Sequence, residues 1–237
     1  MYLPNAREYR HAVDLRHVAI VVWALSWLGV TAAYVASALG DHVPTCIPHL
    51  TGCTSVSAAG RHGAGFFIFK AAMLPAAAFW IVYWVLCGHW LRSSGETSTH
   101  WRTATVATGV VGALFFVLYT TFLGSEGDLY RAMRRYGTIV FFGCTFLAEL
   151  FLAYRAQAAL GETRLVRIKV FLCLAVLVEG LTLGTLQNFV EDDDWIENLT
   201  EWHVASAIAF YPFLTWLMWR RSGWTIEFSV KPPSGGP

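Results

Sequence analysis

The residues best suited to chemistry gather in one polar stretch, between positions 45 and 70. One proline and four glycines prevent a continuous helix there before about position 63. Such a segment can close a disulfide, hold an anionic group or present a hydroxyl to a base. Its nucleophilic, basic and metal-ligating side chains are Cys46, His49, Cys53, Ser55, Ser57, Arg61, His62 and Lys70.

Cys46 and Cys53 are the two cysteines that share one connecting segment. A disulfide between them is physically reasonable if the segment faces an oxidising compartment. The alternative is a zinc site, in which His49 and then His62 or His42 complete the ligands. Because the spacing matches no familiar zinc pattern, we predict the disulfide and no metal.

The composition indicates what kind of elements must hold this stretch. Hydrophobic residues make up 56% of the chain and charged residues 14%, against about 25% charged in an average soluble protein. Apolar surface on this scale cannot be hidden in one water-soluble core, so we predict an integral membrane protein with a single domain. The net charge of +1 gives no reason to expect nucleic acid as a partner.

Six apolar stretches are long enough to cross a bilayer, which needs about 20 residues in a helix. Each should be helical, because lipid leaves backbone groups to be paired within their own segment. The predicted fold class is all-α, a polytopic six-helix transmembrane bundle with a tail over 221–237. Gly180 and Gly184 predict close packing of the fifth helix. The spans lie at about 18–39, 64–91, 103–123, 137–159, 166–189 and 202–219.

The distribution of Lys and Arg predicts that both termini are cytoplasmic. With the N-terminus inside, twelve of these residues lie on the cytoplasmic side, Lys169 among them, four lie outside, and Lys70 lies within a span. The segment at 45–63 then faces the oxidising, non-cytoplasmic side. Residues 36–38 resemble a signal-peptidase site, but the apolar run before them exceeds the roughly 7–15 residues of a signal peptide, so we predict an uncleaved first helix.

Two carboxyl groups fall within the predicted spans, Glu149 in the fourth and Glu179 in the fifth. An acidic residue such as Asp costs about 2.5–3.5 kcal/mol there on insertion scales, so both should face the interior of the bundle. They can handle protons or contact a substrate headgroup. The alternative is a structural hydrogen bond between helices, for example to Thr145 or Thr182.

The last predicted span opens with Glu201, Trp202 and His203. His203 can act as a general base toward Ser55 or Ser57 if the segments meet. A lone histidine is, however, more often a packed and hydrogen-bonded residue. Glutamate at a helix start is favoured by the helix dipole, and tryptophan at a membrane interface is ordinary.

Charged residues near the other span ends suit an anionic ligand or a cation. Arg131 and Arg134 precede the fourth span, and a guanidinium pairs well with phosphate. Lys70 lies near the outer end of the second span, where it can anchor the helix or reach a headgroup. The acidic run at 191–194 can gather a divalent cation, but it lacks the spacing of an EF-hand, which favours a solvated face.

Short motifs in the polar stretch resemble the first non-cytoplasmic loop of the Frag/DRAM/Sfk family. The branch that looks closest is the GPI-lipid-remodelling one, post-GPI-attachment-to-proteins factor 2. Lys70 stands where that branch has an arginine, which weakens the case for tight phosphate recognition. The matching motifs are Thr45-Cys46, Ser55-Val56-Ser57-Ala58-Ala59-Gly60, Ile68-Phe69-Lys70 and, at the final helix, Glu201-Trp202.

The resemblance implies work on membrane lipids, namely acyl-chain remodelling at the non-cytoplasmic leaflet. We assign His203, Ser57 and Glu201 to catalysis. The alternative is a regulator or scaffold without turnover, and a protein partner is possible under either hypothesis. No cofactor is expected, because a haem- or quinone-linked protein would need facing histidines inside spans one, three, four and five, which contain none. The substrate-binding candidates are Lys70, Ser55, His49, His62, Arg61, Arg131, Arg134, Glu149 and Glu179.

These assignments predict one outward-facing cavity, roofed by residues 45–70 and bordered by spans two and six. The two carboxyl groups inside the spans should face the same interior from a deeper position. The side chains expected to meet at the mouth of the cavity are Lys70, Ser57, Glu201 and His203.

Overall fold

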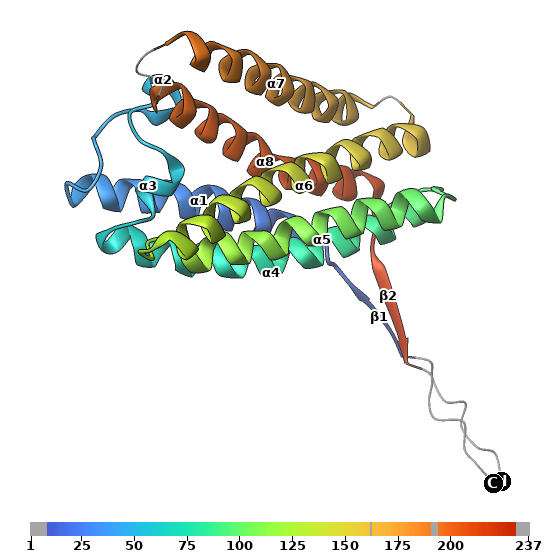
Figure 1. Ribbon diagram of the computed structural model, residues 1–237. Helices are drawn as coiled ribbons and strands as arrows, with labels where there is room; N and C mark the ends of the chain where they lie inside the picture. The colour runs from blue at the N-terminus through green and yellow to red at the C-terminus, as the bar shows by residue number, and fades with distance from the viewer. Residues whose placement is uncertain (1–8, 162, 191–193, 231–237) are drawn as a thin grey trace, which may run out of the picture.

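The computed structural model describes residues 9–161, 163–190 and 194–230, and long helices account for most of them (Figure 1). Two single-turn helices, α2 (Pro48–Thr51) and α3 (Val56–Ala59), connect α1 to α4, and a 3-10 turn at Gln187–Phe189 follows α7. The long helices are α1 (His17–Leu39), α4 (Gly63–Ser93), α5 (Thr99–Phe122), α6 (Asp128–Leu160), α7 (Arg164–Leu186) and α8 (Asp194–Ser222).

Four of the described helices are long and apolar enough to cross a membrane: α1, α4, α5 and α6. They are consistent with the predicted integral membrane protein. That α7 and α8 also span the membrane, and that both termini are cytoplasmic, stay predictions.

Consecutive long helices run antiparallel, and α7 lies at the edge of the bundle (Figure 1). α1 packs on α4, α4 on α5, and α5 on α6, while α8 packs against α1 and α7 packs mainly against α8. The α1–α4 and α5–α6 connections lie together with the first turns of α8 at one end, on the left of Figure 1. We call this the loop end, and it carries the polar stretch.

Aromatic side chains fill the contact between α4 and its neighbours. Trp80, Tyr83 and Trp84 of α4 are buried with Trp219 of α8, and the ring centroids of Tyr83 and Trp219 lie 5.9 Å apart. A Cβ at Gly109 of α5 would lie 2.2 Å from the Trp84 indole, so a larger residue there would push α5 away. Large buried aromatic surfaces of this kind dominate core energetics and hold α4, α5 and α8 together.

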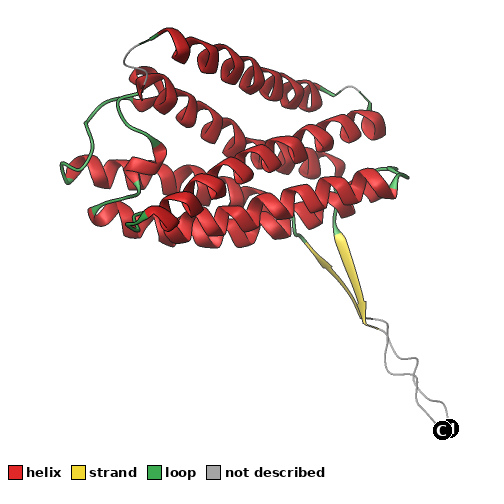
Figure 2. Cartoon of the chain, viewed as in Figure 1, coloured by secondary structure: helices red, strands yellow, loops and turns green. Residues whose placement is uncertain are grey.

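A two-stranded antiparallel ribbon joins the two ends of the chain, shown in yellow in Figure 2. β1 (Tyr9–Val13) pairs with β2 (Ile226–Val230), with Tyr9 opposite Val230. The predicted tail at 221–237 therefore begins as the end of α8 and continues as a strand, while 231–237 lie outside the described residues. Hydropathy could not predict this pairing, because it depends on two segments from opposite ends of the sequence.

Two helices begin earlier than the sequence predicted. α6 starts at Asp128 rather than at 137, and α8 starts at Asp194 rather than at 202. Arg131 therefore lies on a helix and not in a loop, and Glu201 lies inside α8 and not at its start. An apolar run in the sequence marks only the part of a helix suited to the hydrocarbon core of a membrane. The helix itself can continue beyond that run, as long as its backbone hydrogen bonds and end caps are satisfied. Of the acidic run at 191–194, the first three positions lie outside the described residues.

The close packing predicted at Gly180 of α7 does not occur in the structure. A Cβ added at this glycine would meet no atom within 4 Å. α7 stands away from α6 at this level, and the space between them belongs to a cavity. The small residue therefore opens room there rather than bringing two helices into contact.

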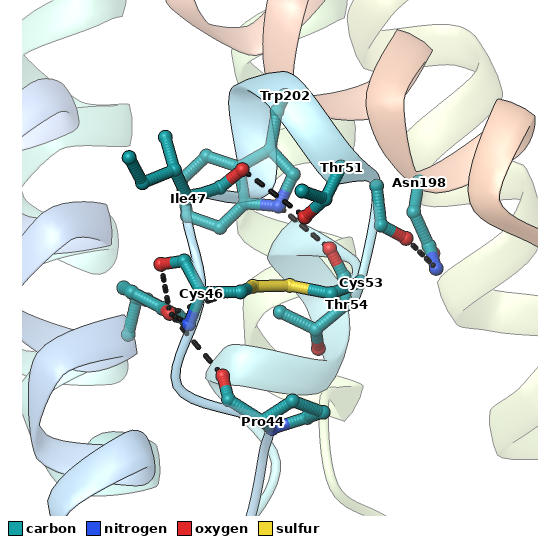
Figure 3. The surroundings of a disulfide bond; sticks show 10 residues. Pro44, Cys46, Ile47, Thr51, Cys53, Thr54, Asn198 and Trp202 are labelled. Carbon is teal, nitrogen blue, oxygen red and sulfur yellow. Dashed lines mark hydrogen bonds between the residues drawn. A yellow bond between two sulfur atoms is a disulfide. The ribbon is translucent and has the colours of Figure 1, made fainter.

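The predicted disulfide between Cys46 and Cys53 is confirmed and closes the segment that contains α2 (Figure 3). Tyr34 of α1 holds one side of it. The Tyr34 hydroxyl accepts the backbone N–H of Cys46 at 2.9 Å and lies 2.7 Å from the Cys46 carbonyl, to which it can donate. Both cysteines are thus joined in a covalent bond, so they are not thiolate ligands of a metal.

The other side of the polar stretch is held by α8 (Figure 3). The Trp202 indole N–H donates to the Thr54 carbonyl at 2.8 Å, and the Asn198 amide donates to the Gly52 carbonyl at 2.9 Å. Gly52 has a φ of 61°, and a Cβ there would lie 2.0 Å from the backbone carbonyl oxygen of Trp195. Only glycine fits this close approach without strain. The polar stretch and the first turns of α8 therefore form one unit.

Candidate functional site

A cavity of about 850 Å³ opens at the loop end between α3, α6, α7 and α8. Four arginines and two carboxyl groups contribute to its wall, and we call it the arginine cavity. Ser57, Arg61, Arg131, Arg134 and Glu201 were predicted as site residues, and the structure brings these five together. The charged and hydroxyl-bearing side chains in its wall include Ser57, Arg61, Arg131, Arg134, Arg135, Glu197 and Glu201.

Among the described residues, one ion pair joins a cavity arginine to a carboxylate. Arg131 approaches Asp128 at 3.9 Å on the exposed first turn of α6, which is a weak, solvent-screened pair. Arg134 donates from Nη1 to the Ser125 carbonyl at 2.6 Å, and Arg61 donates from Nη2 to the Ser57 hydroxyl at 3.1 Å. Guanidinium groups gathered around one space repel one another, so an anion bound between them would relieve that repulsion.

Glu201 and Ser57 meet at the wall of the cavity. The Ser57 backbone N–H donates to Oε1 of Glu201 at 3.2 Å, at the start of α3. Burial raises the pKa of Glu201, which precedes the predicted span at 202–219, to about 7. The Ser57 hydroxyl lies 3.1 Å from the Ser55 hydroxyl and accepts from Arg61. Glu201 can therefore exchange a proton near neutral pH beside a pair of hydroxyl groups.

His203, the third predicted catalytic residue, lies in a separate cluster behind this wall. Its Nδ1 is 2.5 Å from Oε1 of Glu179 on α7, and its Nε2–H donates to the His49 carbonyl at 2.9 Å. The His49 ring in turn places Nε2 2.8 Å from the hydroxyl of Ser206 on α8. We call His49, Glu179, His203 and Ser206 the histidine cluster. Burial and the nearby His203 lower the pKa of His49, so its neutral form prevails at neutral pH.

An apolar pocket lies beside the arginine cavity and is lined by one residue of the histidine cluster, Ser206. Its volume is about 50 Å³, and aromatic side chains dominate its wall. Tyr119, Phe142 and Glu201 line both the pocket and the arginine cavity, whereas Ser206 lines the pocket. The two spaces therefore share one carboxyl group and two aromatic rings in their walls.

Lys70 lies apart from the side chains that the sequence predicted around it. Its ammonium group donates to the Thr121 carbonyl at the end of α5, at 3.0 Å, and lies 4.3 Å from the Phe66 ring centroid. The His62 ring lies 5.9 Å from the ring of His42, and His62 is exposed. The long, flexible side chain of Lys70 lets its ammonium group bond to a carbonyl of a neighbouring helix. The spacing of residues along the sequence does not indicate which carbonyl that will be.

Glu149 is buried deep in the bundle, as predicted, but Thr145 does not bond to it. Within the described part of the chain, neither carboxylate oxygen of Glu149 and no hydroxyl of Thr145 has a hydrogen-bond partner. Lys169, counted with the cytoplasmic residues, is 1% exposed and donates to the Thr215 hydroxyl at 2.5 Å. Lys169 lies near the start of α7 and points into the bundle, where Thr215 and the ring of Tyr211 on α8 contact its ammonium group.

The residues assigned to a site from the sequence did not include Arg135, Glu197, Lys169 or Ser206. Arg135 directly follows Arg134, which was assigned, and this neighbourhood in the sequence was a signal that could have found it. Ser206 is three residues after His203 on an otherwise apolar stretch, so helical spacing was a signal that both face neighbouring helices. The described residues contain no group of three or more His, Cys, Asp or Glu side chains that could hold a metal ion.

Comparison with known proteins gives no relative for this chain: no family model, no curated protein and no solved structure matches it. The resemblance to the Frag/DRAM/Sfk family therefore stays a prediction that depends on its short motifs.

Proposed function

We propose that this chain is an integral membrane protein that binds the anionic headgroup of a lipid in the arginine cavity and remodels the acyl chains of that lipid at the non-cytoplasmic leaflet. The observation that carries the proposal is the cavity itself, where four arginines surround about 850 Å³ next to an apolar pocket. A lipid combines the same two properties in one molecule, a charged head and an apolar tail.

The shape of the site favours a ligand that enters from the side. Residues of α6 and α7 line the arginine cavity, and the space between them is open at Gly180. Apolar side chains near this opening, among them Ile139 and Leu181, are 57% and 64% exposed. In a bilayer such side chains contact lipid tails, so a lipid can place its headgroup among the arginines while its tails remain in the membrane.

The headgroup chemistry follows from the charges in the wall. Guanidinium groups form paired, charge-assisted hydrogen bonds with phosphate, and four of them contribute to the wall of this cavity. Glu197 and Glu201 contribute negative charge to the opposite part of the wall, which suits a hydroxyl or ammonium group carried beside the phosphate. The favoured ligand is therefore a phospholipid or glycolipid with at least one phosphate.

Lipid retention by the purified protein tests the binding part of the proposal. The double variant Arg131→Gln/Arg134→Gln should retain at least tenfold less phosphatidylglycerol than the wild type in native mass spectrometry, because two charge-assisted contacts are lost. The matched control is Arg164→Gln/Arg167→Gln, which removes the same charge from the first turn of α7. Equal retention by both double variants would refute binding in the cavity.

Turnover is measured in the same preparation. Phosphatidylglycerol with isotope-labelled acyl chains should lose or exchange a chain during incubation with the wild type, as followed by mass spectrometry. If the lipid is bound in the cavity and its chains remain unchanged, remodelling is wrong and the chain is a regulator or scaffold of membrane lipids.

A further inference from the structure

The Ser206 hydroxyl and the His49 imidazole form a contact that no sequence motif indicates. The Oγ of Ser206 lies 2.8 Å from Nε2 of His49, within the range of a strong hydrogen bond. The two residues are 157 positions apart and meet because α2 packs on α8. A hydroxyl paired with an imidazole is the arrangement by which serine is activated as a nucleophile.

The His49 ring is held in a defined orientation. It packs between Trp27 of α1 and Trp202 of α8, with ring centroids 5.7 Å and 5.0 Å away. Its backbone carbonyl accepts the Nε2–H of His203, which is anchored in turn by Glu179. The last two residues act on the backbone of His49 and are therefore positioning residues. A base fixed in this way needs little reorganisation when the reaction occurs.

The location of Ser206 suits an acyl ester. Ser206 lines the apolar pocket, whose wall the arginine cavity shares at Glu201. Along α8 it lies five residues beyond Glu201, about 7.5 Å further from the loop end at the ordinary rise of a helix. In a lipid, the ester carbonyls likewise lie below the phosphate, on the side of the tails. A headgroup among the arginines would thus direct an ester toward Ser206.

Ser57, the serine chosen from the sequence, has different partners. Its hydroxyl accepts from Arg61 and contacts Ser55, and its backbone N–H donates to Glu201. These contacts suit a residue that shapes the arginine cavity. The serine that has an imidazole within hydrogen-bond distance, able to accept its proton, is Ser206, which contacts His49.

We propose that Ser206 is the nucleophile and His49 the general base in the transfer of an acyl chain from an ester-linked lipid. This inference rests on the proposed function and adds the residues that carry it out. With its proton on Nδ1, His49 accepts the Ser206 proton at Nε2 while Oγ attacks the ester carbonyl carbon. The lipid alkoxide leaves, takes that proton from His49, and departs as an alcohol, so the acyl chain is bound to Ser206.

The second half of the reaction reverses the roles. Water, or the hydroxyl group of a second lipid, gives its proton to Nε2 of His49 and attacks the acyl-serine. Ser206 leaves with that proton, and the product is a free fatty acid or a newly acylated lipid. No oxidant, reductant or metal takes part in either half.

The first experiment asks which serine reacts covalently. The detergent-solubilised wild type is incubated with an alkyl fluorophosphonate, and the modified residue is identified by peptide mass spectrometry. Ser206 should be labelled, and Ser206→Ala should abolish labelling. The matched control Ser222→Ala removes a hydroxyl from the exposed end of the same helix and should be labelled as the wild type is. Labelling at Ser57, or no labelling of folded wild type, would overturn the inference.

The second experiment follows acyl release from isotope-labelled phosphatidylglycerol. Ser206→Ala should reduce the rate to background, and His49→Gln should lower it at least about 100-fold, the usual size of a general-base contribution. Thermal unfolding of each variant shows that the fold is kept. Were Ser206→Ala to misfold, Ser206→Cys keeps the size of the side chain, and its thiol should form a thioester with the labelled chain.

A pH profile separates a base from a structural residue. The titratable groups that face His49 are His203 of α8 and, through it, Glu179 of α7, while α1 contributes the non-titrating ring of Trp27. The rate should fall in acid with a midpoint below the ordinary histidine value of about 6.5, because His49 must be neutral. A rate independent of pH across that range would contradict the role of His49.

The outcomes distinguish this inference from the proposed function. Arg131→Gln/Arg134→Gln should lose lipid retention but keep fluorophosphonate labelling at Ser206. A protein in which Ser206→Ala still binds and turns over the lipid refutes only the nucleophile. A protein that is labelled at Ser206 but retains no anionic lipid refutes only the cavity.

Discussion

Nδ1 of His203 on α8 lies 2.5 Å from a carboxylate oxygen of Glu179 on α7. Nε2 of the same ring carries a proton, because it donates to the His49 carbonyl. The hydrogen bond between Nδ1 and the Glu179 carboxyl group needs a second proton, which lies between these two atoms. This contact holds the half of α7 nearer the loop end against α8. The other half of α7 is tied by the bond from Lys169 to Thr215.

The first prediction concerns this tie between the two helices. Glu179→Ala and His203→Ala should each lower the free energy of unfolding by about 1–2 kcal/mol, as expected for a partly exposed hydrogen bond with charge. The double variant should cost less than the sum, because both remove one interaction. Thermal unfolding in detergent measures the cycle, with Glu126→Ala in the exposed α5–α6 connection as control. Strictly additive effects would show that the pair contributes nothing.

The second prediction concerns the disulfide between Cys46 and Cys53. Replacing both by serine should lower the free energy of unfolding by about 2–3 kcal/mol, since the short closed loop restricts the unfolded chain. Thiol labelling of denatured, non-reduced wild type should modify Cys87, Cys144 and Cys173 only. Cys144→Ala serves as control, because it removes a thiol outside the bridge. Labelling of either bridged cysteine without reductant would contradict the pairing.

The third prediction separates two buried charged residues that the sequence treated differently. Lys169→Ala should cost about 2–5 kcal/mol, because it leaves a space in the core and removes one of the hydrogen-bond partners of Thr215. Glu149→Gln should stay within about 1 kcal/mol of wild type, since no described group bonds to its carboxyl oxygens. Arg167→Ala on the exposed face of α7 is the control. An equal, large loss in both variants would instead indicate that Glu149 and Lys169 form a buried ion pair.

The fourth prediction concerns Glu96, which pairs with Arg155 at the end opposite the loop end. The Arg155 guanidinium holds the pKa of Glu96 below its ordinary value of 4.5. The carboxylate therefore stabilises the fold at all pH values above 4.5, and this contribution is lost as the pH falls through the lowered pKa. Glu96→Gln should cost about 2 kcal/mol at neutral pH.

The pH dependence itself provides the check on Glu96. Unfolding measured from pH 7 down to pH 3 should show a steeper loss of stability for wild type than for Glu96→Gln, and the two curves should converge in acid. Glu126→Gln, at an exposed position, should follow the wild type. Parallel curves for wild type and Glu96→Gln would show that Glu96 does not contribute through its charge.

The helical class of the chain, with its long apolar segments, and the disulfide could both be predicted without the structure. The first follows from hydropathy, which is a property of each segment alone. The second follows from the short separation of the two cysteines, which are only seven positions apart in one connecting segment and therefore stay close in space. The sequence also picked out much of the arginine cavity, because Arg131, Arg134 and Ser57 all lie close to predicted helix ends at one surface.

Which of these residues lie in contact depends on how the helices pack. Ser206 meets His49 across 157 positions, and Lys169 turns inward to Thr215, because the rotation of each helix about its axis directs every side chain. That rotation is set by packing, such as the fit of Gly109 against Trp84, and not by local pattern. The sequence could therefore name polar residues at the same depth, but it could not show that Lys70 would bond to the end of α5 while Ser206 faced an imidazole.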